Sequence, residues 1–432
     1  MASTLEKLEI SRLINRFGFG PKPGEFASLL AGGVTAARSK ILGINALDSG
    51  LAGVVEPRFI DLGNFPPSNT PERVKFAQDM RSQNIDLQFW WMDRMVLADV
   101  GLQERLTWFW HGHWATSIGK VEYALPMKLQ NETLRQNALG NFKVMARTMV
   151  IDPALMYWLD SNGSVKGNAN ENLSREFMEL FTLGVGNYTQ DDVVALAKAF
   201  TGWHVDRSSG VTSFDAKKHD SSALTILGTT ASWDAQAVSD FIVSTSANAK
   251  FITDRLWFRF LSTSTPKPAD LEPSFVDRDI LKAVIALATH KSMQDPTLAQ
   301  AKSPLEWFVG ICRALKITPS VMQNRAQVIN YLDKLGQVPF LPPNVGGWPF
   351  DSAWINLSTS QYRVAFASYL VEQGDLTPIT GLFGLQMQNA LQNWLGIPEL
   401  SMRTKAVIRN QANTSKQILI SALCAPEYVV SA

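Results

Sequence analysis

Residues 170–203 read NENLSREFMELFTLGVGNYTQDDVVALAKAFTGW, and this stretch decides the fold class. Its first half has an apolar stripe at helical spacing, made of Leu173, Phe177, Leu180 and Phe181. Residues spaced in this way face one side of an α-helix, and the glycines at 184 and 186 end it. Thr189 and Asp192 then have the spacing of a capping box, which starts a second helix. The stretch therefore predicts two helices joined by a glycine-containing turn.

The opposite arc of the first predicted helix, called the central helix below, carries the charged and polar residues Glu171, Asn172, Arg175, Glu176 and Glu179. One interpretation is a solvated face held together by ion pairs between residues four positions apart. The other is a catalytic face, with Glu176 or Glu179 as a general base and Arg175 beside them. We expect Arg175 to be buried and paired with a carboxylate, so that its loss costs about 3–5 kcal/mol.

Two histidines lie close together in the segment FWHGHWATS at residues 109–117. Residues two positions apart face opposite sides of a helix, so His111 and His113 converge only if the helix frays at Gly112. In that case they are candidate metal ligands, and otherwise they are packed aromatic side chains.

A further pair of candidate ligands, His219 and Asp220, lies in the segment HDSSALTILG at residues 219–228. The surrounding residues 204–235 lose helical periodicity, which predicts a small β-hairpin or an extended loop. Together with the two histidines of residues 109–117 and one central-helix glutamate, this pair suits a divalent transition metal ion.

Residues 341–363, LPPNVGGWPFDSAWINLSTSQYR, form a long loop built from glycine and proline. Loops of this length inside compact domains tend to be functional. We expect this loop to fold over the central helix as one wall of a cleft, with Trp348 or Trp354 as a platform for substrate. Trp203, after the second helix, is a third candidate. The alternative is that the indoles fill the core.

The segment FITDRLWFRFLS at residues 251–262 has two arginines on one helical face. Arg255 and Arg259 either face a cleft or form a solvated basic ridge, and the ridge is the simpler interpretation.

These segments resemble a bacterial family known as domain of unknown function 1800. The stretch ENLSREFMELFTLGVGNYTQDDV contains every letter of its approximate pattern ENxxRExxELxTLGxGxYTxxDV. FWHGHWATS resembles FWHxHFxTS, with Trp114 in place of phenylalanine, and the loop resembles PPxVxGWxxGxxWL. HDSSALTILG keeps the first two residues of HDxGxKxxLG but lacks its lysine. The resemblance covers the entire chain.

The resemblance also implies a setting for the protein. Members often carry export signals, so an exported or periplasmic location is expected, although the N-terminus here has no apolar signal region. Members are often encoded beside a sulfatase-like family, which implies a sulfatase-like partner protein and joint work on a polymer. The family has no established activity.

Composition excludes several classes of protein. Forty basic and 39 acidic side chains give a net charge of +1, which argues against nucleic-acid binding. No run of about 18 apolar residues occurs, so no transmembrane segment is predicted. Two cysteines in 432 residues exclude a disulfide framework.

The predicted fold is mainly α. We expect a single large multi-helical domain over residues 1–432, with long irregular loops and at most a small β-hairpin. Its signature core covers residues 102–262, and the loop at 341–363 adds the tryptophans.

Two functional hypotheses follow. In the first, the protein is a metal-dependent hydrolase or related enzyme that acts on a polysaccharide or other cell-envelope substrate. In the second, it is a non-catalytic envelope binding or accessory protein.

Overall fold

The structure of the protein is a computed structural model that describes residues 3–43, 48–409 and 414–431. It is mainly α, as the sequence predicts. Residues 1–2, at the start of the N-terminal segment discussed above, lie outside the described ranges.

Helices account for most of the elements. The N-terminal part contains α1 (Thr4–Arg16), α2 (Glu25–Ile41), η1 (Ser49–Gly53), α3 (Pro71–Leu97), α4 (Leu102–His113), α5 (Ile118–Val121), α6 (Ala124–Asn137), α7 (Phe142–Met149) and α8 (Pro153–Trp158). The middle part contains α9 (Glu171–Glu176), η2 (Phe177–Thr182), α10 (Gln190–Ala199), β1 (Trp203–Asp206), β2 (Val211–Phe214), β3 (Ala223–Ile226), β4 (Thr229–Ser232), α11 (Ala235–Ser244) and α12 (Ser246–Phe260).

The C-terminal part contains η3 (Ala269–Phe275), α13 (Ile280–Thr289), η4 (Lys291–Gln294), β5 (Gln300–Ala301), α14 (Pro304–Leu315), η5 (Pro319–Val321), α15 (Arg325–Lys334), η6 (Asp351–Trp354), α16 (Leu357–Val371), η7 (Thr377–Ile379), α17 (Gly384–Leu395), α18 (Met402–Arg409), α19 (Ser415–Leu423), α20 (Pro426–Val429) and β6 (Val430–Ser431). The strand β6 pairs with β5 and brings the C-terminus beside α1.

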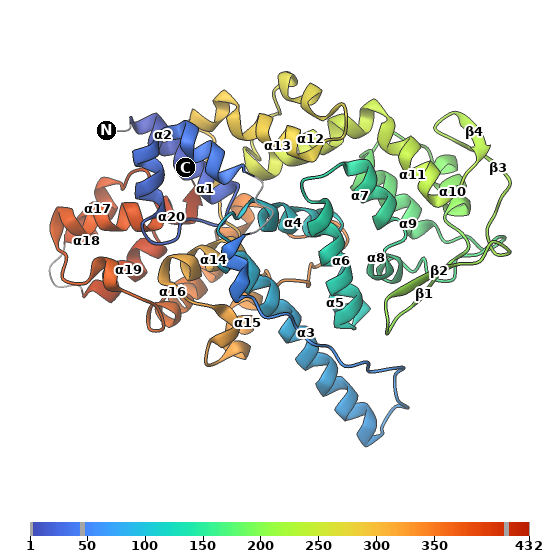
Figure 1. The fold of residues 1–432 in the computed structure, drawn as a ribbon, viewed down its shortest axis with the longest axis horizontal. Helices are drawn as coiled ribbons and strands as arrows, with labels where there is room; N and C mark the ends of the chain where they lie inside the picture. The colour runs from blue at the N-terminus through green and yellow to red at the C-terminus, as the bar shows by residue number, and fades with distance from the viewer. Residues whose placement is uncertain (1–2, 44–47, 410–413, 432) are drawn as a thin grey trace.

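Helix α4 lies at the centre of the molecule, between two hydrophobic cores (Figure 1). The first core joins α1 and α2 to α6–α13, and Leu106 and Trp110 of α4 belong to it. The second core joins α3 to α14–α20 and includes Trp108 of α4. A helix that is apolar on all sides is buried on all sides, and the sequence LTWFWHGHW has this property.

The predicted central helix changes type halfway along its length. Residues 171–176 form the α-helix α9, and residues 177–182 continue it as the π-helix η2. The backbone N–H of Leu183 donates to the carbonyl of Met178 at 2.8 Å, a five-residue step. The wider turn rotates the buried face, so that Met178 and Thr182 are buried beside Phe177 and Phe181. The capping box of Thr189 and Asp192 begins α10 as predicted.

Residues 203–232 form two antiparallel hairpins, β1–β2 and β3–β4, where one small hairpin or an extended loop was predicted. In Figure 1 the β3–β4 hairpin lies at the right edge of the molecule, beyond α10 and α11, and the β1–β2 hairpin lies below them. Four-residue strands separated by glycine-containing turns account for the missing helical periodicity.

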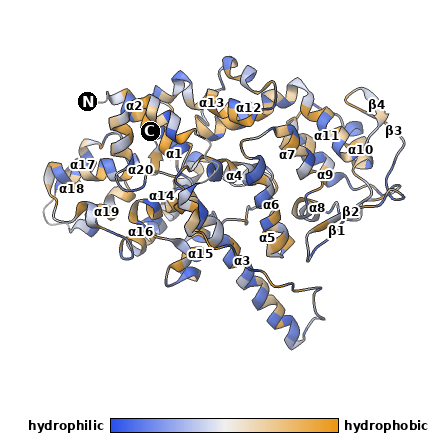
Figure 2. Cartoon of the chain, in the orientation of Figure 1, coloured by the Kyte–Doolittle hydropathy of each residue, from blue (hydrophilic) through white to orange (hydrophobic). Residues whose placement is uncertain are grey.

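Helix α3 projects from the body of the molecule as its longest helix (Figure 1). Its N-terminal half, PERVKFAQDMRSQ, is largely hydrophilic, and Figure 2 shows polar residues along this projecting part. Its C-terminal half is aromatic and buried in the second core. Among the described helices, none is both long enough and apolar enough to cross a membrane.

Candidate functional site

The charged side chains on the face of α9 and η2 pair mostly with one another and with nearby residues. The Arg175 guanidinium donates to the Glu171 carboxylate at 2.9 Å and to the Gln190 side chain at 3.0 Å. Both partners of the ion pair are 40% exposed, so the prediction that Arg175 is buried is wrong, whereas the predicted pairing with a carboxylate is confirmed. The reason is geometric, because the buried side of this helix is occupied by apolar residues and by the small polar residues Ser174 and Thr182.

The two predicted general bases differ in their surroundings. The Tyr188 hydroxyl donates to the Glu179 carboxylate at 2.6 Å, and burial together with Glu179 raises the pKa of Tyr188 to about 12. Burial, followed by the charge of Glu179, raises the pKa of Glu176 above its usual value. A carboxyl group with a raised pKa can exchange protons nearer to neutral pH.

His111 and His113 face different cores, because α4 continues unbroken through Gly112. His111 lies in an aromatic cage of Trp91, Trp108, Phe340 and Trp348, and neither of its ring nitrogens has a hydrogen-bond partner in the structure. Burial lowers the pKa of His111 to about 3. Its imidazole is therefore neutral and packs as an aromatic ring.

His113 is held by the π-helix. Its Nε2 lies 2.9 Å from the carbonyl oxygen of Phe181 and donates to it. The neighbouring carbonyl of Thr182 accepts from the Asn248 side chain on α12 at 2.9 Å. Burial, and then the charge of Arg255, lowers the pKa of His113 to about 3. The carbonyls of Phe181 and Thr182, at the end of η2, thus fix α4 and α12 relative to each other.

His219, Asp220 and Trp203 lie together near the hairpins. The Nδ1 of His219 is 3.1 Å from the carbonyl oxygen of Thr201, and the Asp220 backbone N–H donates to the Thr201 hydroxyl at 2.8 Å. Trp203 packs on Phe214 with ring centroids 5.1 Å apart, and Phe214 packs on His219 at 5.5 Å.

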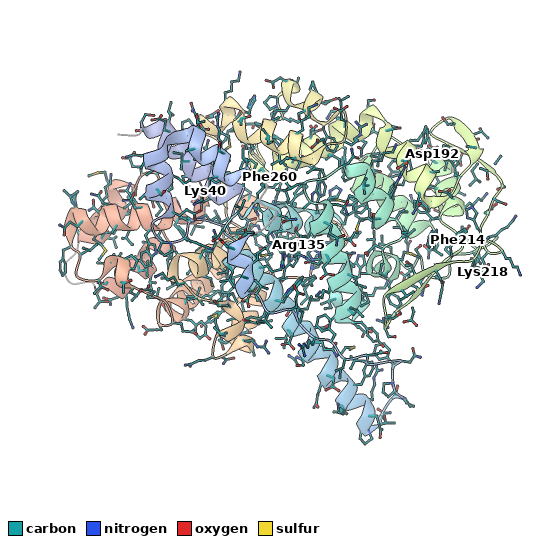
Figure 3. The ribbon with its side chains drawn as sticks, in the orientation of Figure 1. Lys40, Arg135, Asp192, Phe214, Lys218 and Phe260 are labelled. Carbon is teal, nitrogen blue, oxygen red and sulfur yellow. The ribbon has the colours of Figure 1, made fainter. Side chains whose placement is uncertain are left out.

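Figure 3 shows how far this hairpin cluster is from the two histidines of α4. Phe214 lies at the right edge of the molecule, whereas Phe260, which packs on α4 through Phe109, lies near the centre. The four predicted metal ligands are therefore not brought together. Within the described ranges, no three His, Cys, Asp or Glu side chains form a group that could hold a metal ion.

A different part of the molecule has a hollow lined by charged and aromatic side chains, which we call the arginine cleft. It consists of two adjoining pockets that share Phe258, Arg259 and Phe350. The remaining lining comes from α1, α4, α12, α14, the residues around β5 and β6, and the loop after Leu341, and consists of Asn15, Arg16, Arg105, Trp108, Phe109, Gly112, His113, Arg255, Thr263, Gln300, Ala301, Lys302, Glu306, Trp348, Asp351 and Ser431.

One wall of the arginine cleft is the predicted tryptophan loop. Trp348 packs against Trp108 of α4 with ring centroids 4.8 Å apart and is only 5% exposed. Gly347 has a positive φ of 85°, and a Cβ there would collide with the Gly112 carbonyl oxygen of α4. Glycine thereby allows the loop to lie directly on the end of α4.

Trp354 is also buried but does not line the cleft. The loop was expected to cover the central helix, yet the cleft that it walls is formed by α4 and α12.

Arg255 and Arg259 face this cleft from successive turns of α12 and do not form a solvated ridge. Within the described ranges, the Arg255 guanidinium makes no hydrogen bond and no ion pair. Burial lowers the pKa of Arg255 below its usual value. Arg259 donates to the Glu306 carboxylate at 3.0 Å and lies 4.8 Å from the centre of the Phe350 ring. The guanidinium groups of Arg255 and Arg259 therefore have N–H groups that could donate to a ligand.

Glu306 is the buried carboxylate of the cleft. It accepts from Arg105 of α4 and from Arg259 of α12, and it also forms the capping box of α14 with Ser303. Burial alone would raise the pKa of Glu306, but the two arginines outweigh it and hold the pKa at about 2. Glu306 is thus ionised, and it neutralises only one of the guanidinium charges around it.

The outer end of the cleft contains more charge. The Arg16 guanidinium donates to the carbonyls of Leu261 at 3.0 Å and Ser431 at 2.6 Å, which ties α1 to the C-terminal strand. Asp351 accepts from the backbone N–H of Ala301 at 2.8 Å and from the Thr263 hydroxyl. These contacts hold the loop, β5 and α1 around one opening.

Sequence reasoning missed most of the charged residues of the cleft. Arg16, Arg105, Lys302, Glu306 and Asp351 come from four separate segments, and none belongs to a local chemical motif. The only local signal was the capping box formed by Ser303 and Glu306, which marks a helix start and no chemistry.

Comparison with known proteins places the chain in a family but adds no activity. No curated protein and no solved structure matches it. A family model described as a protein of unknown function, DUF1800, matches residues 12–430, which is nearly the whole chain. The protein therefore belongs to the DUF1800 family.

Proposed function

We propose that the protein binds an organic anion in the arginine cleft. The acidic group of the ligand lies against Arg255 and Arg259, and its apolar portion lies against the aromatic wall. The observation that carries this proposal is the Arg255 guanidinium, which is desolvated but has no hydrogen bond or ion pair within the described ranges.

An unpaired buried charge destabilises a protein unless another group compensates for it. Arg255 is half-buried, and its guanidinium carbon lies 6.0 Å from the centre of the Phe251 ring, but no carboxylate within the described ranges pairs with it. His113, on which its charge acts, is neutral. Glu306 contacts Arg259 but leaves the rest of that guanidinium free. A carboxylate, sulfate or phosphate group would supply the missing acceptors, and guanidinium groups bind such planar or multidentate anions well.

The aromatic wall favours a ligand with a ring. Trp348 and Trp108 pack on each other and are almost fully buried. Phe350 and Phe258, which pack edge to face with centroids 5.2 Å apart, are half-buried and supply the accessible ring surface of this wall. Aromatic surfaces bind planar rings and the apolar faces of sugars. An aryl or glycosyl acid therefore matches both the charge and the wall of the cleft.

Isothermal titration calorimetry tests this proposal with benzoate, phenyl sulfate and phenyl phosphate, and with benzyl alcohol as the neutral analogue. We expect at least one anion to bind, and benzyl alcohol to bind at least about tenfold more weakly, because it lacks the charge. Arg255→Gln should weaken the anion by a similar factor. Lys250→Gln, an exposed position on the same helix, is the matched control and should bind as the wild type does.

Equal binding of all three anions by wild type and Arg255→Gln would contradict the proposal. So would binding that the neutral analogue reproduces, because the aromatic wall alone would then account for the affinity.

A second candidate function is the hydrolysis of a polysaccharide or other cell-envelope substrate, with Glu176 as the general base. The raised pKa of Glu176 and its position beside Glu179 favour it. The four predicted metal ligands do not fit a shared ion, so no step is assigned to a metal. Release of reducing sugar from acidic polysaccharides should fall in Glu176→Gln and persist in Glu171→Gln. Elemental analysis of protein purified without a metal-affinity column tests the predicted divalent ion.

A further inference from the structure

Lys302 is a buried amine at the outer end of the arginine cleft. It follows β5 and directly precedes Ser303, the N-cap residue of α14. Its backbone is fixed on both sides, because its N–H donates to the Val429 carbonyl at 2.8 Å and its carbonyl accepts from Arg363 at 3.4 Å. The side chain is thereby directed by a rigid segment.

The Lys302 amine has no polar partner. Its Nζ lies 3.8 Å from the centre of the Tyr428 ring, and within the described ranges it makes no hydrogen bond and no ion pair. Burial lowers the pKa of Lys302 to about 7, although the charge of Glu306 acts in the opposite direction. Near neutral pH a large fraction of this amine is therefore unprotonated, and the unprotonated amine is the nucleophilic form.

Several charged groups line the pocket of Lys302. Arg16 of α1, Arg105 of α4 and Arg259 of α12 line the same pocket, together with Glu306 of α14 and Asp351 of the loop. Tyr428 of α20 and Arg363 of α16 complete the surroundings. Arg259 borders both pockets of the cleft, so a ligand carboxylate bound to it lies at the edge of the pocket that Lys302 lines.

We propose that Lys302 is an amine nucleophile for ligands that carry a carbonyl group next to an acidic group, such as 2-oxo acids and aldehyde acids. The inference rests on the proposed anion binding, because Arg259 and Arg255 would bring the carbonyl carbon to the amine. A desolvated lysine in an apolar setting, such as Lys302 over the Tyr428 ring, is one of the settings in which proteins form imines.

The proposed step is balanced without any oxidant or reductant. The Lys302 nitrogen adds its electron pair to the carbonyl carbon, and one of the two amine protons passes to the carbonyl oxygen to give a carbinolamine. The nitrogen then loses its proton and the carbon loses the hydroxyl group, which leave together as water. The product is an imine between Lys302 and the ligand.

Reductive trapping with cyanoborohydride tests the inference on the full-length protein. Two aldehydes are compared, formaldehyde and glyoxylate, which differ by a carboxylate, and the labelled lysines are identified by peptide mass spectrometry. Lys316 is the internal control, because it is exposed on the C-terminal side of α14 and pairs with Asp375 at 2.9 Å. Lys302→Met removes the proposed nucleophile.

At about pH 7 we expect formaldehyde to label Lys302 at least about tenfold faster than Lys316, because far more of the Lys302 amine is unprotonated. Glyoxylate should increase this preference further. Arg259→Gln should abolish that increase, which is measured in each aldehyde as the ratio of labelling at Lys302 to labelling at Lys316. The Met variant should keep its labelling at Lys316 and show no additional preferred lysine.

Failure to label Lys302 with formaldehyde would overturn the inference, because the amine would be protonated or closed off. Labelling by formaldehyde without a preference for glyoxylate would overturn it as well. Calorimetry with benzoate separates the two proposals, since anion binding that persists while Lys302 stays unreactive leaves the proposed function intact.

Discussion

The acidic face of α9 and the arginine cleft are both rich in charge, but they use it differently. On α9 the charged side chains pair with one another at the surface, and the Arg175–Glu171 pair is 40% exposed on both sides. In the cleft Arg259 is only 12% exposed, and its neighbour Arg255 has no hydrogen bond or ion pair within the described ranges. Exposed pairs are compensated by water as well as by each other.

This difference shows where a ligand is required. A further partner stabilises a surface helix with complete ion pairs only a little. An acceptor for a desolvated guanidinium that has none stabilises the protein much more. The π-helix η2 therefore has a positioning role, since its carbonyls hold His113, which lines the cleft, and Asn248 of α12.

The largest effect should come from Glu306→Gln in the cleft. It removes the carboxylate shared by Arg105 and Arg259 and leaves two buried guanidinium groups unneutralised. We expect a loss of about 3–5 kcal/mol in the free energy of unfolding. Chemical denaturation measures it, with Glu171→Gln on α9 as the control, which should change stability by less than about 1 kcal/mol. Equal losses of unfolding free energy in both variants would contradict the difference between the cleft and the α9 face.

Lys302→Met should stabilise the protein, and the gain should depend on pH. The pKa of Lys302 is about 7 in the folded state against 10.5 ordinarily, so the folded state opposes protonation. The resulting cost is fully present below about pH 7 and is relieved as the pH rises toward 10. We expect the variant to be more stable by on the order of 2–4 kcal/mol at pH 6, and this advantage to shrink in alkaline solution. A pH-independent difference would indicate that the amine is not desolvated.

His111→Phe should remove part of the acid sensitivity of the protein. The pKa of His111 is about 3 in the folded state against 6.5 ordinarily, so its stability contribution is present above pH 6.5 and is lost as the pH falls toward 3. Between pH 7 and pH 5, the free energy of unfolding of the wild type should fall by about 2 kcal/mol more than that of the variant. Thermal melts across this range measure the difference, and His204→Gln on β1 controls for an exposed histidine. Identical pH profiles for His111→Phe and wild type would contradict the aromatic-cage description.

The smallest effect should come from Arg175→Ala on α9. Because the guanidinium is 40% exposed, its loss should cost no more than about 1 kcal/mol, in contrast to the 3–5 kcal/mol expected for a buried pair. Denaturation of Arg175→Ala beside Glu306→Gln checks the ranking. A loss as large as that of Glu306→Gln would mean that the α9 face is more than a solvated surface.

Local features of the fold could be predicted because local residues determine them. The capping box of Thr189 and Asp192 and the glycines at 184 and 186 were sufficient to define α10 and the turn before it. The π-turn at 177–182 could not be predicted, since it depends on the neighbours that accept its rotated face.

The site was harder to predict because it is assembled from distant segments. Trp348 was identified by the glycine and proline of its loop, and it does line a cleft. Arg16 and Glu306 are 290 positions apart in the sequence, and only tertiary packing brings them into one pocket. The two histidines of α4 were placed in one cluster, whereas an unbroken helix directs them into opposite cores.

The central claim is that Arg255 is a cation without an ion pair and that an anionic ligand supplies the missing partner. Thermal melts of wild type and Arg255→Gln, each with and without an anion such as benzoate, test this claim most directly. Without ligand the variant should melt at the same temperature as the wild type or higher, because it lacks a desolvated charge. With the anion at about 100 times its dissociation constant the wild type should gain about 2.7 kcal/mol and overtake the variant. A variant that is less stable without ligand, together with a wild type that does not respond to the anion, would contradict the account.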